Sequence, residues 1–220
     1  MKKGVIFDMD GVLVDSGPAH IASWRALAGK HGVEMSDEQF AACFGQTSRD
    51  IIRQLWGPDV SDDAVRRFDD EKEAIYRELI TGNVPLAPGA REMLTGLQQD
   101  GCVLAVATSG PRENVELVLR EAELAPFFAA VVTGFDVSKG KPAPDCFLLA
   151  AERAGLSPAD CVVVEDAPVG IQAALAAQMK PIGFVGTHAA ERLTQAGAPL
   201  TVQHLTEITP HVVAELLSQS

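Results

Sequence analysis

Short apolar runs alternate with amphipathic stretches along most of the chain. The short runs are typical of strands buried on both faces of a parallel sheet, and the stretches between them carry apolar residues at helical spacing. This alternation predicts the α/β class, with a doubly wound parallel sheet. The predicted strands are 5–7, 103–107, 130–133, 162–164 and 182–185, and the predicted helices are 91–99, 114–123, 145–154 and 170–178.

The stretch 16–85 breaks the alternation. Its apolar residues follow helical spacing, for example at Ile21, Trp24 and Leu27, and no segment reads as a strand. The Gly- and Pro-rich segment 81–89 has the composition of a linker, and 13–18 would be its counterpart. We therefore predict a small all-helical domain, 16–85 with hinge linkers, inserted after the first strand of a core formed by 1–15 and 86–220.

Two carboxylates follow the first predicted strand. Asp8 and Asp10 end the run Val5–Phe7, and Gly11 permits a sharp turn after them. Ligands bind beyond the carboxyl ends of strands in open α/β sheets. Neighbouring carboxylates repel each other unless a cation or a proton lies between them. Mg²⁺ with a phosphate group suits such a site, whereas solvated turn acids are the plain alternative.

Three later segments place polar residues at the same level of the sheet. Thr108 and Ser109 can donate to a phosphate oxygen, although a Ser/Thr turn explains them equally well in isolation. Lys141, held extended before a proline, would neutralise a phosphoryl group, and its alternative is an ordinary solvated lysine. Glu165 and Asp166 end a buried strand and repeat the charge problem of the first motif. A shared Mg²⁺ resolves both problems.

Together these segments resemble the four motifs of the haloacid dehalogenase-like superfamily, in the branch of β-phosphoglucomutase and small sugar-phosphate phosphatases. The segment 4–16 resembles the first motif, Thr108 the second, 140–145 the third, and 164–173 the fourth, with Ala167 where Ser is common. The resemblance implies a Rossmann-like core and a small helical cap. It implies that Asp8 is the nucleophile and Asp10 the general acid and then base, and it favours Lys141 over Lys139. The implied set is Asp8, Asp10, Thr108 and Lys141 for catalysis, and Asp8, Asp10, Glu165 and Asp166 for Mg²⁺.

The predicted helical domain offers weaker candidates. His20 and Trp24 are four residues apart, hence on one face of a helix, and both resemble positions of the mutase. We expect Trp24 in the core of that domain. For His20, a role at the cap–core interface and an ordinary surface position both stay open. Lys72 resembles a cap lysine of the mutase, with a solvated charged face as the alternative.

Two departures from the mutase bear on the reaction. The segment 45–50 resembles its cap specificity loop, but Arg49 falls one position later than the phosphate-binding arginine. Gly110-Pro111-Arg112 stands where the mutase has a Ser-Lys pair for a second phosphate. Both departures argue against a bisphosphate intermediate. The substrate-binding candidates are Ser109, His20, Arg49, Lys72 and Arg112.

We therefore expect a Mg²⁺-dependent hydrolase of small phosphomonoesters, with sugar phosphates as the expected substrates. The alternative is β-phosphoglucomutase activity, in which a sugar hydroxyl replaces water as acceptor. A dehalogenase shares the fold but has no need for the acids at 10, 165 and 166. We do not expect a non-catalytic binding module, because such a module would not need every one of these motif residues.

The amino-acid composition excludes some classes of binding partner. A net charge of −12 argues against sequence-independent nucleic-acid binding, and no apolar run reaches the ~20 residues of a membrane span. The chain begins without the pattern of a signal peptide. The four cysteines, at 43, 102, 146 and 161, are widely spaced without a CxxC pair. We expect a reduced, cytoplasmic monomer that binds a small phosphorylated metabolite.

Overall fold

The computed structural model describes residues 2–36 and 47–219, which form two compact units. Unit 1 combines Met1–Asp15 with Val84–Ser220, and unit 2 is Ser16–Asn83. Unit 1 is therefore split in sequence by unit 2. That unit 2 acts as a cap over the site remains a prediction.

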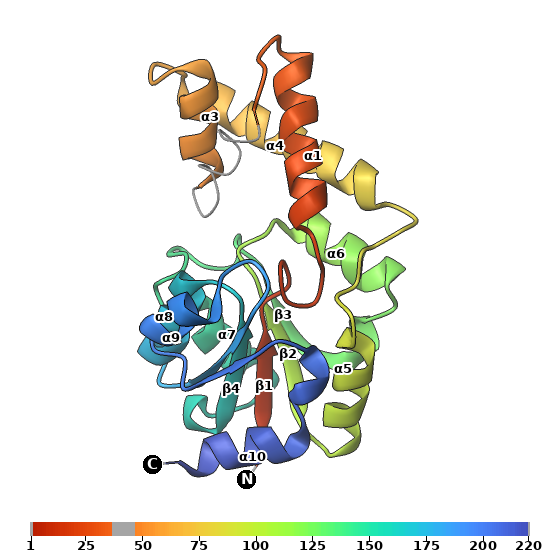
Figure 1. The fold of residues 1–220 in the computed structure, drawn as a ribbon, viewed down its shortest axis with the longest axis vertical. Coiled ribbons are helices and arrows are strands. Elements are labelled where there is room, and N and C mark those ends of the chain that lie inside the picture. The colour runs from red at the N-terminus through yellow and green to blue at the C-terminus, as the bar shows by residue number, and fades with distance from the viewer. Residues whose placement is uncertain (1, 37–46, 220) are drawn as a thin grey trace. The chain divides into compact units, whose positions relative to one another are not determined.

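A six-stranded, all-parallel sheet forms the centre of unit 1, in the order β3-β2-β1-β4-β5-β6 (Figure 1). Strand β1 lies between β2 and β4, where the chain order reverses. The predicted doubly wound α/β fold is confirmed. The strands are β1 Gly4–Phe7, β2 Val103–Ala107, β3 Phe128–Val132, β4 Cys161–Glu165, β5 Lys180–Phe184 and β6 Leu200–Val202.

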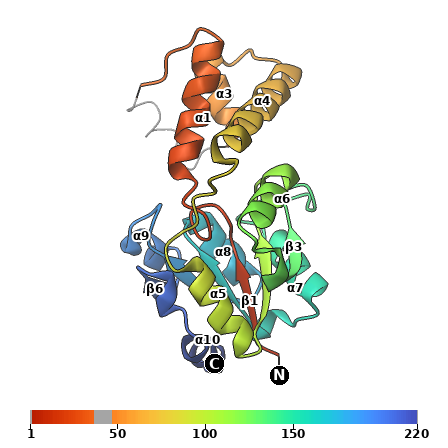
Figure 2. The ribbon, with the colours of Figure 1, turned by 90° about the vertical axis from the view of Figure 1, so that its right-hand side faces the viewer.

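Helices cover both faces of this sheet. In Figures 1 and 2, α5 and α8 lie on opposite sides of β1. Helix α7 packs on β2 and β3, and α8 packs on β4 and β5. The helices of unit 1 are α5 Ala90–Gln99, α6 Arg112–Glu121, α7 Asp145–Ala154, α8 Pro168–Ala176, α9 Ala190–Gln195 and α10 Pro210–Ser218.

The sequence prediction missed β6, α9 and α10, and most of its other boundaries differ from the observed ones by one or two residues. Strand β3 starts at Phe128 and ends at Val132, earlier than predicted. Helix α6 ends at Glu121, because Glu123 adopts a left-handed φ of 51° that stops the helix. The predicted helix α7 and strand β2 have the observed bounds.

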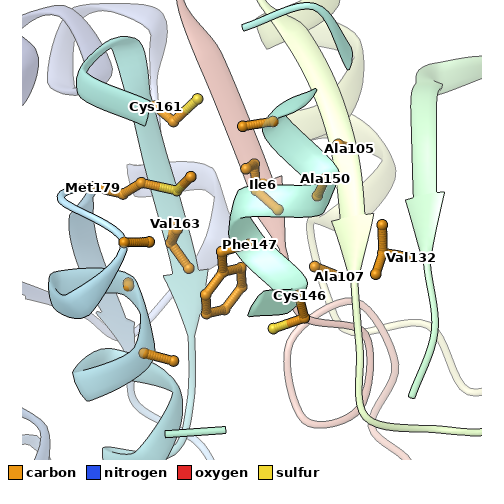
Figure 3. Packing of buried hydrophobic residues seen from close by; sticks show 14 of the residues in the cluster. Ile6, Ala105, Ala107, Val132, Cys146, Phe147, Ala150, Cys161, Val163 and Met179 are labelled. Atoms are coloured by element: carbon orange, nitrogen blue, oxygen red, sulfur yellow. The ribbon is translucent and has the colours of Figure 1, made fainter. Parts of the chain in front are cut away.

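A core of small and branched residues joins α7 and α8 to the sheet (Figure 3). Figure 3 shows Phe147 of α7 beside Val163 of β4, with Ile6 of β1 nearby. All three are fully buried. Burying side chains of this size contributes about 1.5–3 kcal/mol each, and this packing fixes the strand ends that carry the polar residues.

Unit 2 contains α1 Gly17–Lys30, α3 Ser48–Trp56 and α4 Asp62–Ile80, and its described residues include no strand. The Thr47 hydroxyl accepts from Asp50 N at the start of α3, and the Ser61 hydroxyl accepts from Ala64 N at the start of α4. Trp24 is buried in the core of this unit, as predicted. Among the helices described here, none is long and apolar enough to cross a bilayer.

The segments leading to and from unit 2 pair with each other inside unit 1. Val14 and Leu86 form an antiparallel bridge, and Asp15 N donates to Pro85 O at 2.8 Å. These parts of the predicted linkers are therefore anchored. The hinge itself stays a prediction, and we place it beyond this paired segment.

Candidate active site

The register of the sheet brings the carboxyl ends of three strands to one level. Phe7 of β1 pairs with Val106 of β2 and with Val164 of β4. The residues that follow each pair, Asp8 and Glu165 among them, therefore emerge side by side at the carboxyl edge. This is the position predicted from the strand-end pattern.

Lys141 joins two of these carboxylates in a buried ion cluster. Its Nζ donates to Asp8 Oδ1 at 2.8 Å and to Glu165 Oε1 at 2.7 Å, and it lies 4.9 Å from the ring centroid of Phe147. The Lys141 side chain is only 6% exposed, whereas Lys139 is exposed. The structure thus brings Lys141 to the site and leaves Lys139 outside it.

Burial and charge shift the protonation of this cluster. Desolvation, with repulsion from Glu165, raises the pKa of Asp8 to about 7 despite the nearby Lys141 ammonium. Burial acts to lower the pKa of Lys141, but the carboxylates of Asp8 and Glu165 outweigh it and raise this pKa. Lys141 therefore stays charged, and its charge favours the ionised form of Asp8.

Glu165 is fixed from three sides. Besides the Lys141 contact, its Oε2 accepts from Ala167 N at 2.9 Å. The third side is Gly170 of α8, where a Cβ would lie 1.8 Å from Glu165 Oε1. The absence of a side chain at Gly170 therefore makes room for the carboxylate.

Three buried carboxylates are close enough to bind one metal ion. Asp8, Glu165 and Asp166 each offer an oxygen, and these oxygens lie within 4.8 Å of one another. Desolvation, then repulsion from Glu165 and Asp8, raises the pKa of Asp166 well above its usual value. Among the described residues, the ammonium of Lys141 donates to two of these three acids. The surplus negative charge and the all-oxygen donors fit a hard divalent cation such as Mg²⁺.

Asp10 is not a member of this carboxylate group. A Cβ at Gly110 would lie 3.4 Å from Asp10 Oδ2 and 3.5 Å from Thr108 Oγ1, so the Asp10 carboxylate lies beside the loop after β2. Thr108 is buried, and its Oγ1 accepts from Gly110 N at 3.1 Å. Ser109 is exposed in the same loop. The structure therefore places the Asp10 carboxylate and the Thr108 hydroxyl together, beside Gly110.

In unit 2, Lys72 and His20 contact each other. Lys72 Nζ donates to His20 Nδ1 and to Glu73 Oε1, both at 2.7 Å, and lies 5.5 Å from the rings of Trp24 and Tyr76. Lys72 is 3% exposed. The alternative of a solvated face was therefore wrong for Lys72, because its side chain is buried and its ammonium lies near the rings of Trp24 and Tyr76.

The two arginine candidates are both paired with carboxylates. Arg49 donates to Asp62 Oδ1 at 2.9 Å within unit 2. Arg112 donates to Asp136 Oδ1 at 3.2 Å within unit 1. Both side chains remain about half exposed, so their roles in substrate binding stay predictions. Gly45 and Gln46, in the segment that resembles the specificity loop, and Cys43 lie outside the described residues.

The sequence prediction missed polar residues that support this site. Thr187 and His188 follow β5 at the same edge of the sheet and both contact Asp166. Asp136 follows β3 and accepts from the backbone N and hydroxyl of Thr133 and from Arg153. The strand-end pattern that identified the acids could have identified these positions as well.

Comparison with known proteins identifies the family of this chain. The family model for haloacid dehalogenase-like hydrolases matches residues 2–178. A phosphorylated carbohydrates phosphatase of Thermotoga maritima is 32% identical over 207 residues, covering 91% of this chain and 94% of that protein. The β-phosphoglucomutase of Bacillus subtilis is 30% identical, covering 97% and 94%. The crystal structure of a HAD hydrolase, family IA, variant 3 from Entamoeba histolytica superposes with a TM-score of 0.92 at 29% identity and covers both chains completely. The family model matches most of this chain, and the superposed structure covers all of it. This chain is therefore an enzyme of the haloacid dehalogenase-like hydrolase family.

Proposed function

We propose that this enzyme is a Mg²⁺-dependent phosphohydrolase that cleaves small phosphomonoesters, sugar phosphates in particular, through an aspartyl-phosphate on Asp8. The observation that carries the proposal is the buried cluster in which Lys141 Nζ lies 2.8 Å from Asp8 Oδ1, beside Glu165 and Asp166. The similarity to a phosphatase named for phosphorylated carbohydrates supports the substrate class.

In the first half of the reaction, an Asp8 oxygen attacks phosphorus in line with the leaving oxygen. The P–O bond to the sugar breaks as the bond to Asp8 forms. Asp10, which lies beside Thr108, gives its proton to the leaving alkoxide. Lys141 and the Thr108 hydroxyl stabilise the equatorial phosphoryl oxygens.

In the second half, Asp10 takes a proton from a water molecule, which attacks the phosphoryl group. The bond between phosphorus and Asp8 breaks, inorganic phosphate leaves, and both carboxyl groups return to their starting state. Asp8, Glu165 and Asp166 would hold Mg²⁺. When bound, Mg²⁺ supplies positive charge that neutralises phosphate oxygens and keeps Asp8 ionised.

Phosphomutase activity is the second candidate, because β-phosphoglucomutase of Bacillus subtilis matches nearly the whole chain. A mutase must hold a second phosphate and keep water from the aspartyl-phosphate. The candidate cations for that phosphate are Arg49, Lys72 and Arg112, and each is bonded to a carboxylate of its own unit. This pairing favours hydrolysis.

The test is a phosphate-release screen over sugar phosphates with Mg²⁺, run beside a coupled assay for conversion of β-glucose 1-phosphate to glucose 6-phosphate. Asp8→Asn should abolish turnover while the fold is retained, since an amide is a poor nucleophile. Asp160→Asn is the matched control, because Asp160 lies at the opposite end of β4. If Asp8→Asn keeps more than roughly a few per cent of the rate, the aspartyl-phosphate route is wrong. Isomerisation much faster than phosphate release would instead favour the mutase.

A further inference from the structure

The loop that follows β5, residues 185–189, contacts Asp166 at two points; we call it the β5 loop. The Thr187 hydroxyl lies beside the Asp166 carboxylate, since a Cβ built on Gly11 would approach both Thr187 Oγ1 and Asp166 Oδ2, and it acts to lower the pKa of Asp166. His188 Nδ1 lies 3.1 Å from the backbone O of Asp166. Because a carbonyl only accepts, Nδ1 is the donor in this bond. The β5 loop thus holds both the side chain and the backbone of one acid.

The first motif also lies against this acid. Gly11 has a φ of +78°, and a Cβ there would lie 2.0 Å from Asp166 Oδ2 and 2.8 Å from Thr187 Oγ1. Gly186 of the β5 loop also approaches the backbone O of Gly11, which would lie 3.6 Å from a Cβ at that position. The Asp166 carboxylate and the Thr187 hydroxyl therefore both lie against the Gly11 backbone.

We propose that Thr187 is a positioning residue for the metal site, whose hydroxyl fixes the orientation of the Asp166 carboxylate toward Asp8 and Glu165. This inference rests on the proposed function, because it assigns a role toward the metal that the acids would hold. Nothing in the four motifs includes Thr187, which lies 21 positions after Asp166.

The physical reason is the cost of orienting a crowded carboxylate. Asp166 is 5% exposed, so few water molecules reach it to satisfy its oxygens. Repulsion from Asp8 and Glu165 favours rotation of the carboxylate away from the site until a cation is bound. A hydroxyl donor on the side of Gly11 opposes that rotation. Groups that orient metal ligands in this way typically change metal affinity by about 10–100-fold when they are removed.

The experiment compares Thr187→Val, which keeps the shape and loses the hydroxyl, with Thr187→Ser, which keeps the hydroxyl. Thr201→Val is the control, because Thr201 undergoes the same change in the edge strand β6. Binding of Mg²⁺ alone to each full-length protein is measured by calorimetry, without substrate. We expect affinity about 10-fold weaker for Thr187→Val and affinity within about twofold of wild type for Thr187→Ser and Thr201→Val. The half-saturating Mg²⁺ concentration in turnover should shift in parallel.

Unchanged Mg²⁺ affinity in Thr187→Val, in a protein whose wild type binds Mg²⁺, overturns the inference and leaves the proposed function intact. Failure of the wild type to bind Mg²⁺ or to release phosphate overturns the proposed function instead. Thermal unfolding in EDTA verifies the fold of each variant. If Thr187→Val is unfolded, Thr187→Ala replaces it, because the smaller side chain fits the same space. Equal affinities of the Ala and Ser variants then overturn the inference.

Discussion

Gly170→Ala gives a test in which two physical effects have opposite signs. Gly170 lies in the first turn of α8, and replacing a helical glycine by alanine ordinarily raises the free energy of unfolding by about 0.8–1 kcal/mol. Here the new Cβ would lie 1.8 Å from Glu165 Oε1 and 1.9 Å from its Cδ. A contact that short requires the carboxylate to move.

The carboxylate cannot move without losing its partners. Glu165 is 1% exposed, and it accepts from Lys141 Nζ at 2.7 Å and from Ala167 N at 2.9 Å. Hydrogen bonds to a charged group contribute about 1.5–3 kcal/mol each, and overpacking costs a further 1–3 kcal/mol or so. These losses exceed the helix gain. We expect a free energy of unfolding about 3 kcal/mol lower, and a thermal midpoint about 6–12 °C lower in a chain of this size.

Scanning calorimetry and urea unfolding measure this change, and Gly96→Ala is the matched control. Gly96 lies inside α5, and a Cβ there meets nothing within 4 Å. That variant should be about 0.8–1 kcal/mol more stable than wild type. The phosphate-release rate should fall in Gly170→Ala and not in Gly96→Ala, because only the former disturbs Lys141. If Gly170→Ala is as stable as wild type, the account of Glu165 as a fixed, buried acceptor is refuted.

Three further outcomes can be checked by routine assays. Lys141→Met should lower kcat by about 100-fold or more, because it removes the ammonium that faces Asp8, and rates at saturating substrate would show this. EDTA should stop turnover and Mg²⁺ restore it, and Asp166→Ala should raise the half-saturating Mg²⁺ concentration more than Glu165→Ala, because Glu165 is already bonded to Lys141 and to a backbone N–H. Asp136→Asn should lower the free energy of unfolding at pH 7 by about 1–3 kcal/mol. The hydrogen bonds from Thr133 hold the pKa of Asp136 well below its value in the unfolded chain, which is ~3.9. The stabilisation from Asp136 is therefore complete above this unfolded pKa and disappears as the pH falls below it. Unfolding curves measured between pH 7 and pH 3 would show this loss.

The sequence predicted the central strands and the acids because both follow from one pattern. An apolar run buried on both faces has a strong signal, and Asp8 and Glu165 stand directly at the ends of such runs. Strand β6 has three residues at the edge of the sheet, and α9 has six residues with Leu193 as its buried residue. Elements this short carry too few apolar positions to show a period.

Side chains that act through tertiary contacts were harder to predict. Thr187 and Asp136 have the residue types of ordinary turns, and their importance depends on partners far away in the chain. Lys72 lies in a helix rich in Asp and Glu, which reads as a solvated face. Only the packing of α1 against α4 shows that Trp24 and Tyr76 lie near its ammonium. Sequence pattern therefore located the charges at strand ends but not the contacts that orient them.

The central place of β1 has a consequence for how the chain folds. Its partners are β2, about 100 residues later, and β4, about 160 residues later. Unit 2, by contrast, is continuous in sequence, and its helices contact one another across short separations. Non-local pairings form late, because the chain between them must first be ordered. During synthesis, unit 2 can therefore fold before β2 and β4 are available to pair with β1. The carboxylates that follow β1 and β4 meet only after most of the chain has been synthesised, so we expect the proposed metal site to form late in folding.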